Sequence, residues 1–435
     1  MRKDIFTIGF MLFALFFGAG NLIYPPVLGM EAGTAYWPAI TGFILTGVGL
    51  PILAVTAISF VKNDARELAD RVHPLFGLLF TSTVYLAIGA FFGIPRAATV
   101  GYEMSVHPFT EGASNTPLII FTVVFFSLVY LVSLNPSRMV DRIGQYLTPI
   151  LLIAIVGLSI GALLLFDNPA ASPKGDYGST PLFTGFLEGY LTMDAIAALA
   201  FGIIVVNAFK DRGYDSPKQL VSATLKAGIV AGIGLILVYS VLGWIGSKMA
   251  LHGSFTNGGN ILSHAADMIF GSFGTLLLGV IVALACFTTS VGLVVASGQF
   301  FVKVTPLSYK WIISIVTLAS FLIANQGLET IISISVPVLT FIYPIAIVLI
   351  LLTFMDKLFG GRRGVYRGAI LLTAIISLYD GLTAFGLELD QVGRILQLLP
   401  FFSIGLGWLL PAVIGGLAGF FLSGKEESTP DRFAR

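Results

Sequence analysis

Long uncharged stretches fill most of this chain and leave few folds open to it. Of its 435 residues, 56% are hydrophobic and only 11% are charged, whereas soluble domains carry roughly 25% charged residues. In lipid every backbone polar group needs an internal partner, which leaves helices and closed barrels as spanning structures. Most of the stretches reach the roughly 20 residues that a spanning helix requires. We therefore expect an all-α integral membrane protein.

Twelve such stretches follow one another along the sequence, and each predicts one transmembrane helix. They are Ile5–Val27, Tyr36–Val61, Pro74–Ala98, Pro117–Leu134, Ile143–Phe166, Gly185–Asn207, Gln219–Gly246, Ser272–Val302, Leu307–Ala324, Leu328–Phe354, Gly364–Phe385 and Phe401–Leu422. The connections Asp167–Thr184 and Ser247–Gly271 are rich in Gly, Ser and Asn, as exposed loops are. We expect twelve spans with no soluble domain between them.

Basic residues divide unevenly between the two sides that twelve spans define. With the N-terminus in the cytoplasm, only Arg96, Lys174, Lys248 and Arg394 of the 24 Lys and Arg residues fall outside or near an outer helix end. All the other basic residues then lie inside, as the positive-inside rule predicts. The sequence thus indicates a multi-pass protein with cytoplasmic N- and C-termini.

Two of the stretches are interrupted near their centres. The first contains the run Phe17-Gly18-Ala19-Gly20-Asn21, and the sixth contains Thr192-Met193-Asp194. Glycine and asparagine are poor helix formers, so the first run predicts a break in the helix. Unpaired backbone in lipid costs several kcal/mol per group, so such a break persists only where it faces protein, water or a ligand. Paired discontinuous helices indicate the binding site of a transporter.

The positions of the two breaks predict an internal symmetry. They lie in stretches one and six, so each opens a block of five helices. Because five crossings are an odd number, the second block enters the membrane from the opposite side, which gives an inverted repeat whose breaks meet near the midplane. We expect residues 1–166 to form the first repeat and residues 167–360 the second. Residues 361–435 add two helices and a short cytoplasmic tail to this one integrated membrane domain.

Three sequence stretches resemble a known family. They are Gly9–Pro26 (GFMLFALFFGAGNLIYPP), Gly93–Glu103 (GIPRAATVGYE) and Glu188–Gly202 (EGYLTMDAIAALAFG). Together they resemble the bacterial branched-chain amino acid:cation symporters, and the resemblance extends over essentially the whole chain. It implies the five-plus-five leucine-transporter (LeuT-type) fold followed by two further helices. It also implies import of leucine, isoleucine and valine across the bacterial cell membrane, driven by a sodium or proton gradient.

The resemblance also sets what else is expected of the protein. Apart from the co-transported Na+ or H+ it implies no cofactor, and it implies no nucleic acid and no obligatory protein partner. The alternative within the same fold is a LeuT-type secondary transporter of another small neutral amino acid or solute.

An amino acid substrate brings a carboxylate into the membrane, and the first break can bind it. Backbone N–H groups around Gly18, Ala19, Gly20 and Asn21 open the second half-helix, where the helix dipole favours an anion. Close helix packing is the alternative explanation for these glycines, since glycine is common in membrane helices.

The second break carries the charge that an ammonium group requires. A carboxylate at mid-bilayer costs about 2.5–3.5 kcal/mol on insertion scales, so Asp194 should face a partner or a wet cavity. It can bind the substrate ammonium, coordinate a cation or take up a proton during coupling. A purely structural carboxyl, hydrogen-bonded to the other half-helix, is the alternative. Thr192 and Met193 precede it and complete the predicted substrate-binding set.

The eighth stretch contains the predicted cation site. Ala285, Thr288 and Thr289 share one helix face, and their oxygens are the hard ligands that alkali cations prefer. Resemblance to LeuT-type transporters pairs them with the backbone carbonyls of Ala14 and Phe17 in a sodium shell. A Thr hydroxyl often bonds a preceding carbonyl of its own helix instead. The four histidines share no ligand spacing, so we expect no metal beyond the alkali cation.

By the same resemblance Asn21 and Thr192 match a second sodium site beside the substrate carboxylate. Asp194 replaces a neutral residue there, which leaves that second site open. Arg96 and Glu103 frame the predicted outer end of the third stretch. They are candidate gate residues, and snorkelling rim charges are the alternative.

Two other function classes are disfavoured. A channel needs a wet polar pore, whereas Phe13, Phe16, Phe17 and Met193 surround the breaks. An enzyme needs a nucleophile and a base, and Asp194 has neither a His nor a second carboxylate nearby in its helix. We therefore expect a transporter and not an enzyme.

Overall fold

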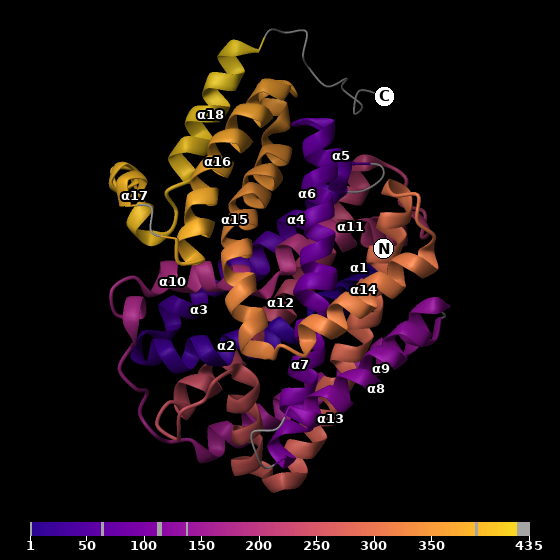
Figure 1. The fold of residues 1–435 in the computed structure, drawn as a ribbon, viewed down its shortest axis with the longest axis vertical. Coiled ribbons are helices and arrows are strands. Elements are labelled where there is room, and N and C mark those ends of the chain that lie inside the picture. Colours follow the sequence, from indigo (N-terminus) through magenta and orange to yellow (C-terminus); the bar gives the residue numbers. More distant parts are fainter. Residues whose placement is uncertain (1, 62–64, 111–114, 136–137, 388–389, 424–435) are drawn as a thin grey trace.

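The computed structural model describes residues 2–61, 65–110, 115–135, 138–387 and 390–423, and these residues form helices without a strand (Figure 1). The first half contains α1 (Arg2–Phe16), α2 (Ala19–Ala32), α3 (Tyr36–Ile44), α4 (Leu50–Ile58), α5 (Ala65–Ala69), α6 (Pro74–Leu86), α7 (Gly93–Ser105), α8 (Thr116–Leu134) and α9 (Arg138–Leu165). The second half contains α10 (Pro181–Glu188), α11 (Asp194–Lys210), α12 (Pro217–Met249), α13 (Gly258–Val304), α14 (Tyr309–Ala324), α15 (Leu328–Met355), α16 (Arg363–Ala384), α17 (Asp390–Leu396) and α18 (Leu409–Leu422).

Short 3-10 and π segments join or extend these helices. They are η1 (Gly33–Ala35), η2 (Leu45–Gly49), η3 (Ala87–Phe91), η4 (His107–Phe109), η5 (Gly175–Gly178), η6 (Gly189–Thr192), η7 (Asp356–Phe359) and η8 (Phe402–Ile404). The segments η2 and η3 are π-helical turns that interrupt the second and third predicted stretches, respectively. Turns of this kind are frequent at functional sites.

Within the described residues, seven helical segments are long and apolar enough to cross a membrane. The bent pair Pro181–Thr192 and Asp194–Lys210 makes an eighth when it is counted as one span. Three further apolar helices are shorter: Pro149–Leu165, Tyr309–Ala324 and Leu409–Leu422. Every predicted stretch overlaps at least one helix. The protein is therefore a multi-pass helical membrane protein, while the count of twelve spans and the inverted repeat stay predictions.

One expected loop is largely helical. Residues 258–270 of the predicted loop Ser247–Gly271 form the first part of α13, so that prediction is wrong there. The side chain of Asn257 accepts a hydrogen bond from the Asn260 N–H at 3.0 Å and caps this helix. Gly271, at φ 67°, then interrupts it in a conformation that glycine adopts without steric cost.

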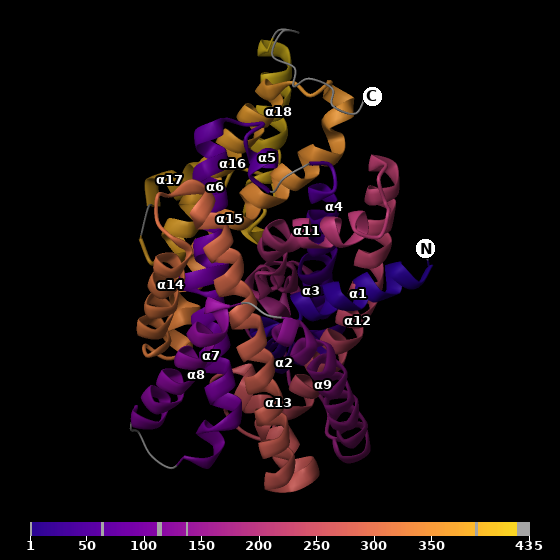
Figure 2. The same cartoon turned by 90° about the vertical axis from the view of Figure 1, so that its right-hand side faces the viewer.

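The elements around the two breaks pack closely together. Helix α12 lies against α1 and α2, and α11 lies against α4 (Figure 2). Helix α10 lies against α3 (Figure 1). The long helix α13 runs beside α7 and also touches α2. The broken helices are thus enclosed on several sides, while large hydrophobic side chains such as Ile153 and Leu164 point outward, as they do in lipid.

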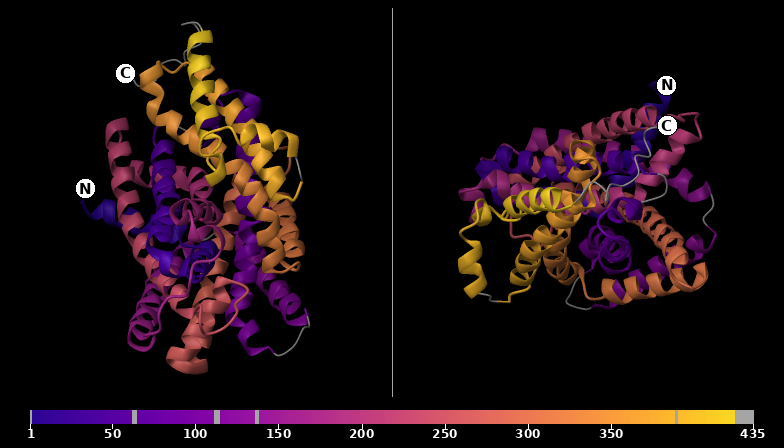
Figure 3. Two further views of the ribbon diagram at one scale, coloured as in Figure 1. Left: turned by 90° about the vertical axis from the view of Figure 1, so that its left-hand side faces the viewer. Right: turned by 90° about the horizontal axis from the view of Figure 1, so that it is seen from above.

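Helices α16 and α18 form a tight pair at the edge of the molecule (Figure 3). Each carries two glycines four residues apart. A Cβ atom added at Gly368 would lie 2.0 Å from the Gly415 carbonyl oxygen, and one added at Gly419 would lie 1.9 Å from that of Gly364. Backbone therefore touches backbone, which is how small residues let membrane helices associate. Helix α15 joins the pair to the remaining helices.

Candidate functional site

The first predicted break is present in the structure. Helix α1 ends at Phe16 and α2 begins at Ala19, while Gly18 is extended at φ −119° and ψ −169°. The Gly18 N–H donates to the side-chain oxygen of Asn21 at 3.1 Å, so Asn21, in the first turn of α2, caps this half-helix. A Cβ atom at Gly20 would lie 3.1 Å from the Thr192 carbonyl oxygen, so Gly20 lets the two breaks approach closely.

The second predicted break is also present. Helix α10 passes into η6, which ends at Thr192, and α11 begins at Asp194 at an angle of 46° to the preceding segment. Met193 between them is left-handed, at φ 66° and ψ 6°. Such a conformation is uncommon for a residue other than glycine and is typical of functional sites.

A buried polar network joins the two breaks. The Asp194 side chain is 4% exposed, and its Oδ2 accepts hydrogen bonds from Asn21 Nδ2 at 2.7 Å and from the Tyr239 hydroxyl at 2.9 Å. Asn21 Nδ2 also lies within hydrogen-bond reach of that hydroxyl. The network thus links α2, α11 and α12. All three members are buried, and both partners of the carboxylate are neutral.

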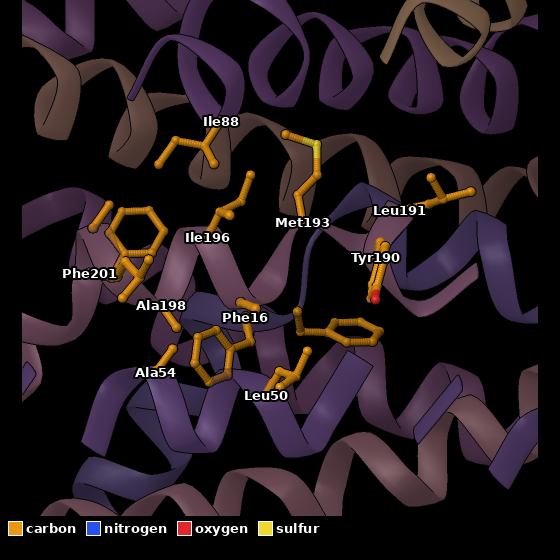
Figure 4. Close-up of a cluster of buried hydrophobic side chains, with 14 of the residues drawn as sticks. Phe16, Leu50, Ala54, Ile88, Tyr190, Leu191, Met193, Ile196, Ala198 and Phe201 are labelled. Carbon is orange, nitrogen blue, oxygen red and sulfur yellow. The ribbon is translucent and has the colours of Figure 1, made fainter. Parts of the chain in front are cut away.

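A cavity lies where the breaks meet. Its empty space is about 450 Å³ when the space at its open side is counted, and the volume open to the centre of a water molecule is about 50 Å³. Part of its wall is apolar and includes Phe16, Ile88, Phe201 and Leu293; the first three belong to the buried cluster of Figure 4. All seven residues predicted to bind substrate line it: Gly18, Ala19, Gly20, Asn21, Thr192, Met193 and Asp194. Their role in binding stays a prediction.

Arg96 lies at this cavity, and its predicted position near an outer helix end is wrong. Its side chain is 3% exposed, and its guanidinium donates to the Leu191 and Thr192 carbonyl oxygens at 2.7 and 3.3 Å. The chain bends at η3 just before α7, and this bend sets Arg96 against the second break. Glu103 lies two turns further along α7, 3.6 Å from His107. The two candidate gate residues thus lie at different depths.

The predicted cation ligands are only partly brought together. Thr289 lines the cavity, and its methyl carbon lies 3.8 Å from the Cβ position of Gly18 at the first break. The Thr288 hydroxyl donates to the Ala285 carbonyl oxygen of its own helix at 2.9 Å. Among the described residues, Ala14, Phe17, Ala285 and Thr288 are absent from the cavity wall. The cation site stays a prediction.

The predicted second cation site has its polar atoms engaged within the protein. The Asn21 side-chain oxygen accepts from Gly18, and the Thr192 hydroxyl donates to the Gly189 carbonyl oxygen at 3.0 Å. Both oxygens keep lone pairs that a cation could use, and that site also stays a prediction.

Sequence reasoning missed Tyr239, the hydroxyl partner of Asp194. The side chain is fully buried in α12, 45 residues along the chain from the carboxylate. Its stretch has no break and no charge beside it, so no local signal distinguishes it from the other tyrosines. The sequence does not distinguish Ile88 and Phe201 of the cavity wall either, since apolar residues fill every span.

Comparison with known proteins identifies the family. A family model described as branched-chain amino acid transport protein matches residues 1–426. The chain belongs to this family. Among curated members of the branched-chain amino acid transport family, BrnQ of Bacillus subtilis is 49% identical over 96% of this chain and 96% of its own length. BraB of the same organism is 47% identical over 97% of this chain and 96% of its own length; both are named branched-chain amino acid permeases.

Solved structures give the fold of this family member. Mhp1 in an inward-facing conformation matches 96% of the chain and 90% of its own length with a TM-score of 0.65 at 14% identity. MhsT in complex with L-phenylalanine matches 97% of the chain and 98% of its own length with a TM-score of 0.52, also at 14% identity. These likenesses show a shared LeuT-type transporter fold.

Proposed function

We propose that this protein is a cation-coupled symporter that imports leucine, isoleucine and valine by alternating access. The observation that carries the proposal is the cavity between the two helix breaks, which combines the ends of two interrupted helices, one buried carboxylate and an apolar wall. A branched-chain amino acid has the matching parts: two opposite charges and a compact apolar side chain. The 47% and 49% identical relatives named as permeases for these amino acids support the substrate class.

We propose a role for each part of the cavity. The first N–H groups of α2, around Ala19 and Gly20, have no partner within their helix and favour an anion, in this case the substrate carboxylate. Asp194 supplies the negative charge for the ammonium group, held in place by Asn21 and Tyr239. Phe16 and Phe201 contribute the apolar surface on which an aliphatic side chain packs.

The position of the cavity inside the helix bundle supports a mechanism of alternating access. A cation beside Thr289 would connect α13 to the first break and favour the conformation that accepts substrate. Substrate binding would then close the outer path, and rocking of one helix group against the other would expose the site to the cytoplasm. One monovalent cation moving down a tenfold gradient and ~100 mV gains about 3.7 kcal/mol, enough for a few hundredfold accumulation of a neutral zwitterion.

Uptake of labelled isoleucine into liposomes containing the purified protein tests the proposal. We expect uptake to need an inward sodium or proton gradient. Thr289→Val should raise the cation concentration that gives half-maximal uptake at least about tenfold. Thr288→Ala tests the neighbouring hydroxyl. Ser290→Ala is the control, because that buried hydroxyl has no hydrogen-bond partner among the described residues. Uptake that persists with both gradients collapsed would exclude symport.

Competition separates the proposed substrates from the alternative. We expect leucine, isoleucine and valine to inhibit uptake of one another more strongly than other neutral amino acids do. A different neutral amino acid or solute that competes better would reassign the substrate while keeping the LeuT-type transport mechanism.

A further inference from the structure

Arg96 brings a buried positive charge to the cavity wall with only neutral partners. Its Nη1 donates to the Leu191 carbonyl and the Tyr24 hydroxyl, at 2.7 and 3.0 Å, and its Nη2 donates to the Thr192 carbonyl. The guanidinium also lies 5.4 Å from the centre of the Tyr24 ring. It forms no ion pair with any residue that the structure describes. A charge inside a membrane protein ordinarily has a counter-charge or faces a polar path.

The guanidinium retains donors for a further partner. It has five N–H groups, and the three hydrogen bonds to Leu191, Tyr24 and Thr192 leave two of them. One of these is at Nε, which is buried without a hydrogen-bond partner within the described part of the chain. Two N–H groups on one edge of this planar fork match the two oxygens of a carboxylate.

Asp194 brings the opposite charge to the same cavity. Its carboxylate is held by the neutral side chains of Asn21 and Tyr239. Each charge lies at the helix end whose dipole favours it: Arg96 at the carbonyl end of η6 and Asp194 at the first residue of α11. Only Met193 separates these two ends, so the cavity wall is positive on one side of the break and negative on the other.

We propose that Arg96 binds the carboxylate of the transported amino acid while Asp194 binds its ammonium group. This inference rests on the proposed function, and it adds a residue that reads the charge pattern of the substrate. The Cβ position of Gly20 lies 3.0 Å from Arg96 Nη2, so the first turn of α2 lies beside the guanidinium. A ligand that lacks either charged group leaves one buried charge without its counterpart, which is costly in a membrane interior.

Two leucine analogues separate this role from a structural one. Leucinol keeps the ammonium group and replaces the carboxylate with an alcohol, whereas 4-methylpentanoate keeps the carboxylate and lacks the ammonium group. Each is measured as an inhibitor of labelled leucine uptake by wild type, Arg96→Gln and Asp194→Asn in liposomes. In wild type we expect both analogues to bind at least about tenfold more weakly than leucine, since each lacks the charged hydrogen bonds of one group.

The two variants should act on different analogues. Arg96→Gln should weaken leucine about tenfold to a hundredfold and leave leucinol within about threefold, so that the preference for leucine over leucinol collapses. Asp194→Asn should do the same for the preference over 4-methylpentanoate. Equal weakening of leucine and leucinol by Arg96→Gln would show that the guanidinium only caps the Leu191 and Thr192 carbonyls, and would overturn the inference.

The remaining outcomes are also decisive. Wild type that binds leucinol as tightly as leucine overturns the inference without any variant. If Arg96→Gln does not fold, Arg96→Lys, which keeps the charge but loses the fork, should reduce the preference for leucine over leucinol, and an unchanged preference contradicts the inference. Wild type that transports none of the branched-chain amino acids would instead refute the proposed function, so the two failures are distinguishable.

Discussion

The hydroxyl of Tyr239 is the residue-scale feature on which the buried network depends. Tyr239→Phe removes one of two hydrogen bonds to Asp194 without changing the shape of the core. We expect a loss of about 1–3 kcal/mol in the free energy of unfolding in detergent, because a buried polar group loses a partner. Leucine uptake should fall with it.

Tyr190→Phe is the matched control for this prediction. Tyr190 is 3% exposed, and its hydroxyl has no hydrogen-bond partner among the described residues. Its loss should therefore leave the free energy of unfolding nearly unchanged. If both tyrosine variants are equally stable, the hydrogen bond to Asp194 contributes nothing measurable.

At the residue scale the sequence predicts which backbone positions surround the cavity, but not their partners. Gly18, Gly20 and Asn21 stand out because they are poor helix formers inside a spanning segment, and Asp194 stands out by its charge in an apolar segment. The partners Arg96 and Tyr239 do not, because their contacts depend on how helices distant in sequence pack. For Arg96 the positive-inside rule predicts a position near an outer helix end, because this rule uses only the order of basic residues and spans along the chain. It contains no information on contacts inside the helix bundle.

At the scale of elements, the second break stores conformational strain at Met193. Met193→Gly should relieve the strain of the left-handed conformation, because glycine adopts it without steric cost. Met193→Ala should retain this strain while also removing the methionine side chain. We expect the glycine variant to be more stable than the alanine variant by about 1 kcal/mol, measured by denaturant unfolding in detergent. An alanine variant as stable as the glycine variant would mean that the break relaxes when the side chain is removed.

Both breaks could be predicted, whereas the start of α13 could not. The glycines at 258 and 259 indicate a loop by composition, yet a Cβ atom at Gly258 would lie 1.9 Å from the Ile23 carbonyl oxygen. Glycine is therefore required there for close contact with α2 and not for chain flexibility. Composition alone does not separate these two uses of glycine.

At the scale of the whole molecule, the α16–α18 pair provides a test of how the last helices attach. Two adjacent glycines of α18 have different surroundings: a Cβ atom at Gly415 would lie 2.1 Å from the Gly368 carbonyl oxygen, whereas one at Gly416 would be in ordinary contact at 3.7 Å. Gly415→Ala should destabilise the protein by about 1–3 kcal/mol, as overpacking does, and Gly416→Ala should not. Thermal unfolding in detergent measures both, and equal stability would contradict the close packing.

The sequence pattern behind such pairs is weak evidence about which helices meet. GxxxG spacing at Gly157–Gly161 and Gly228–Gly232 is typical of helix contacts, but a Cβ atom at Gly157 would meet nothing within 4 Å. Gly228 and Gly232 do pack, against the Ile52 side chain. The GxxxG pattern indicates that another helix can approach closely. Which helix does so depends on the arrangement of the whole bundle.

The hydrogen bonds from Asn21 and Tyr239 to a single oxygen of Asp194 have a mechanical meaning. They fasten the interrupted helices to each other and to α12 at one point deep inside the protein. A movement of one of these three helices that leaves the other two in place therefore has to break at least one of these hydrogen bonds.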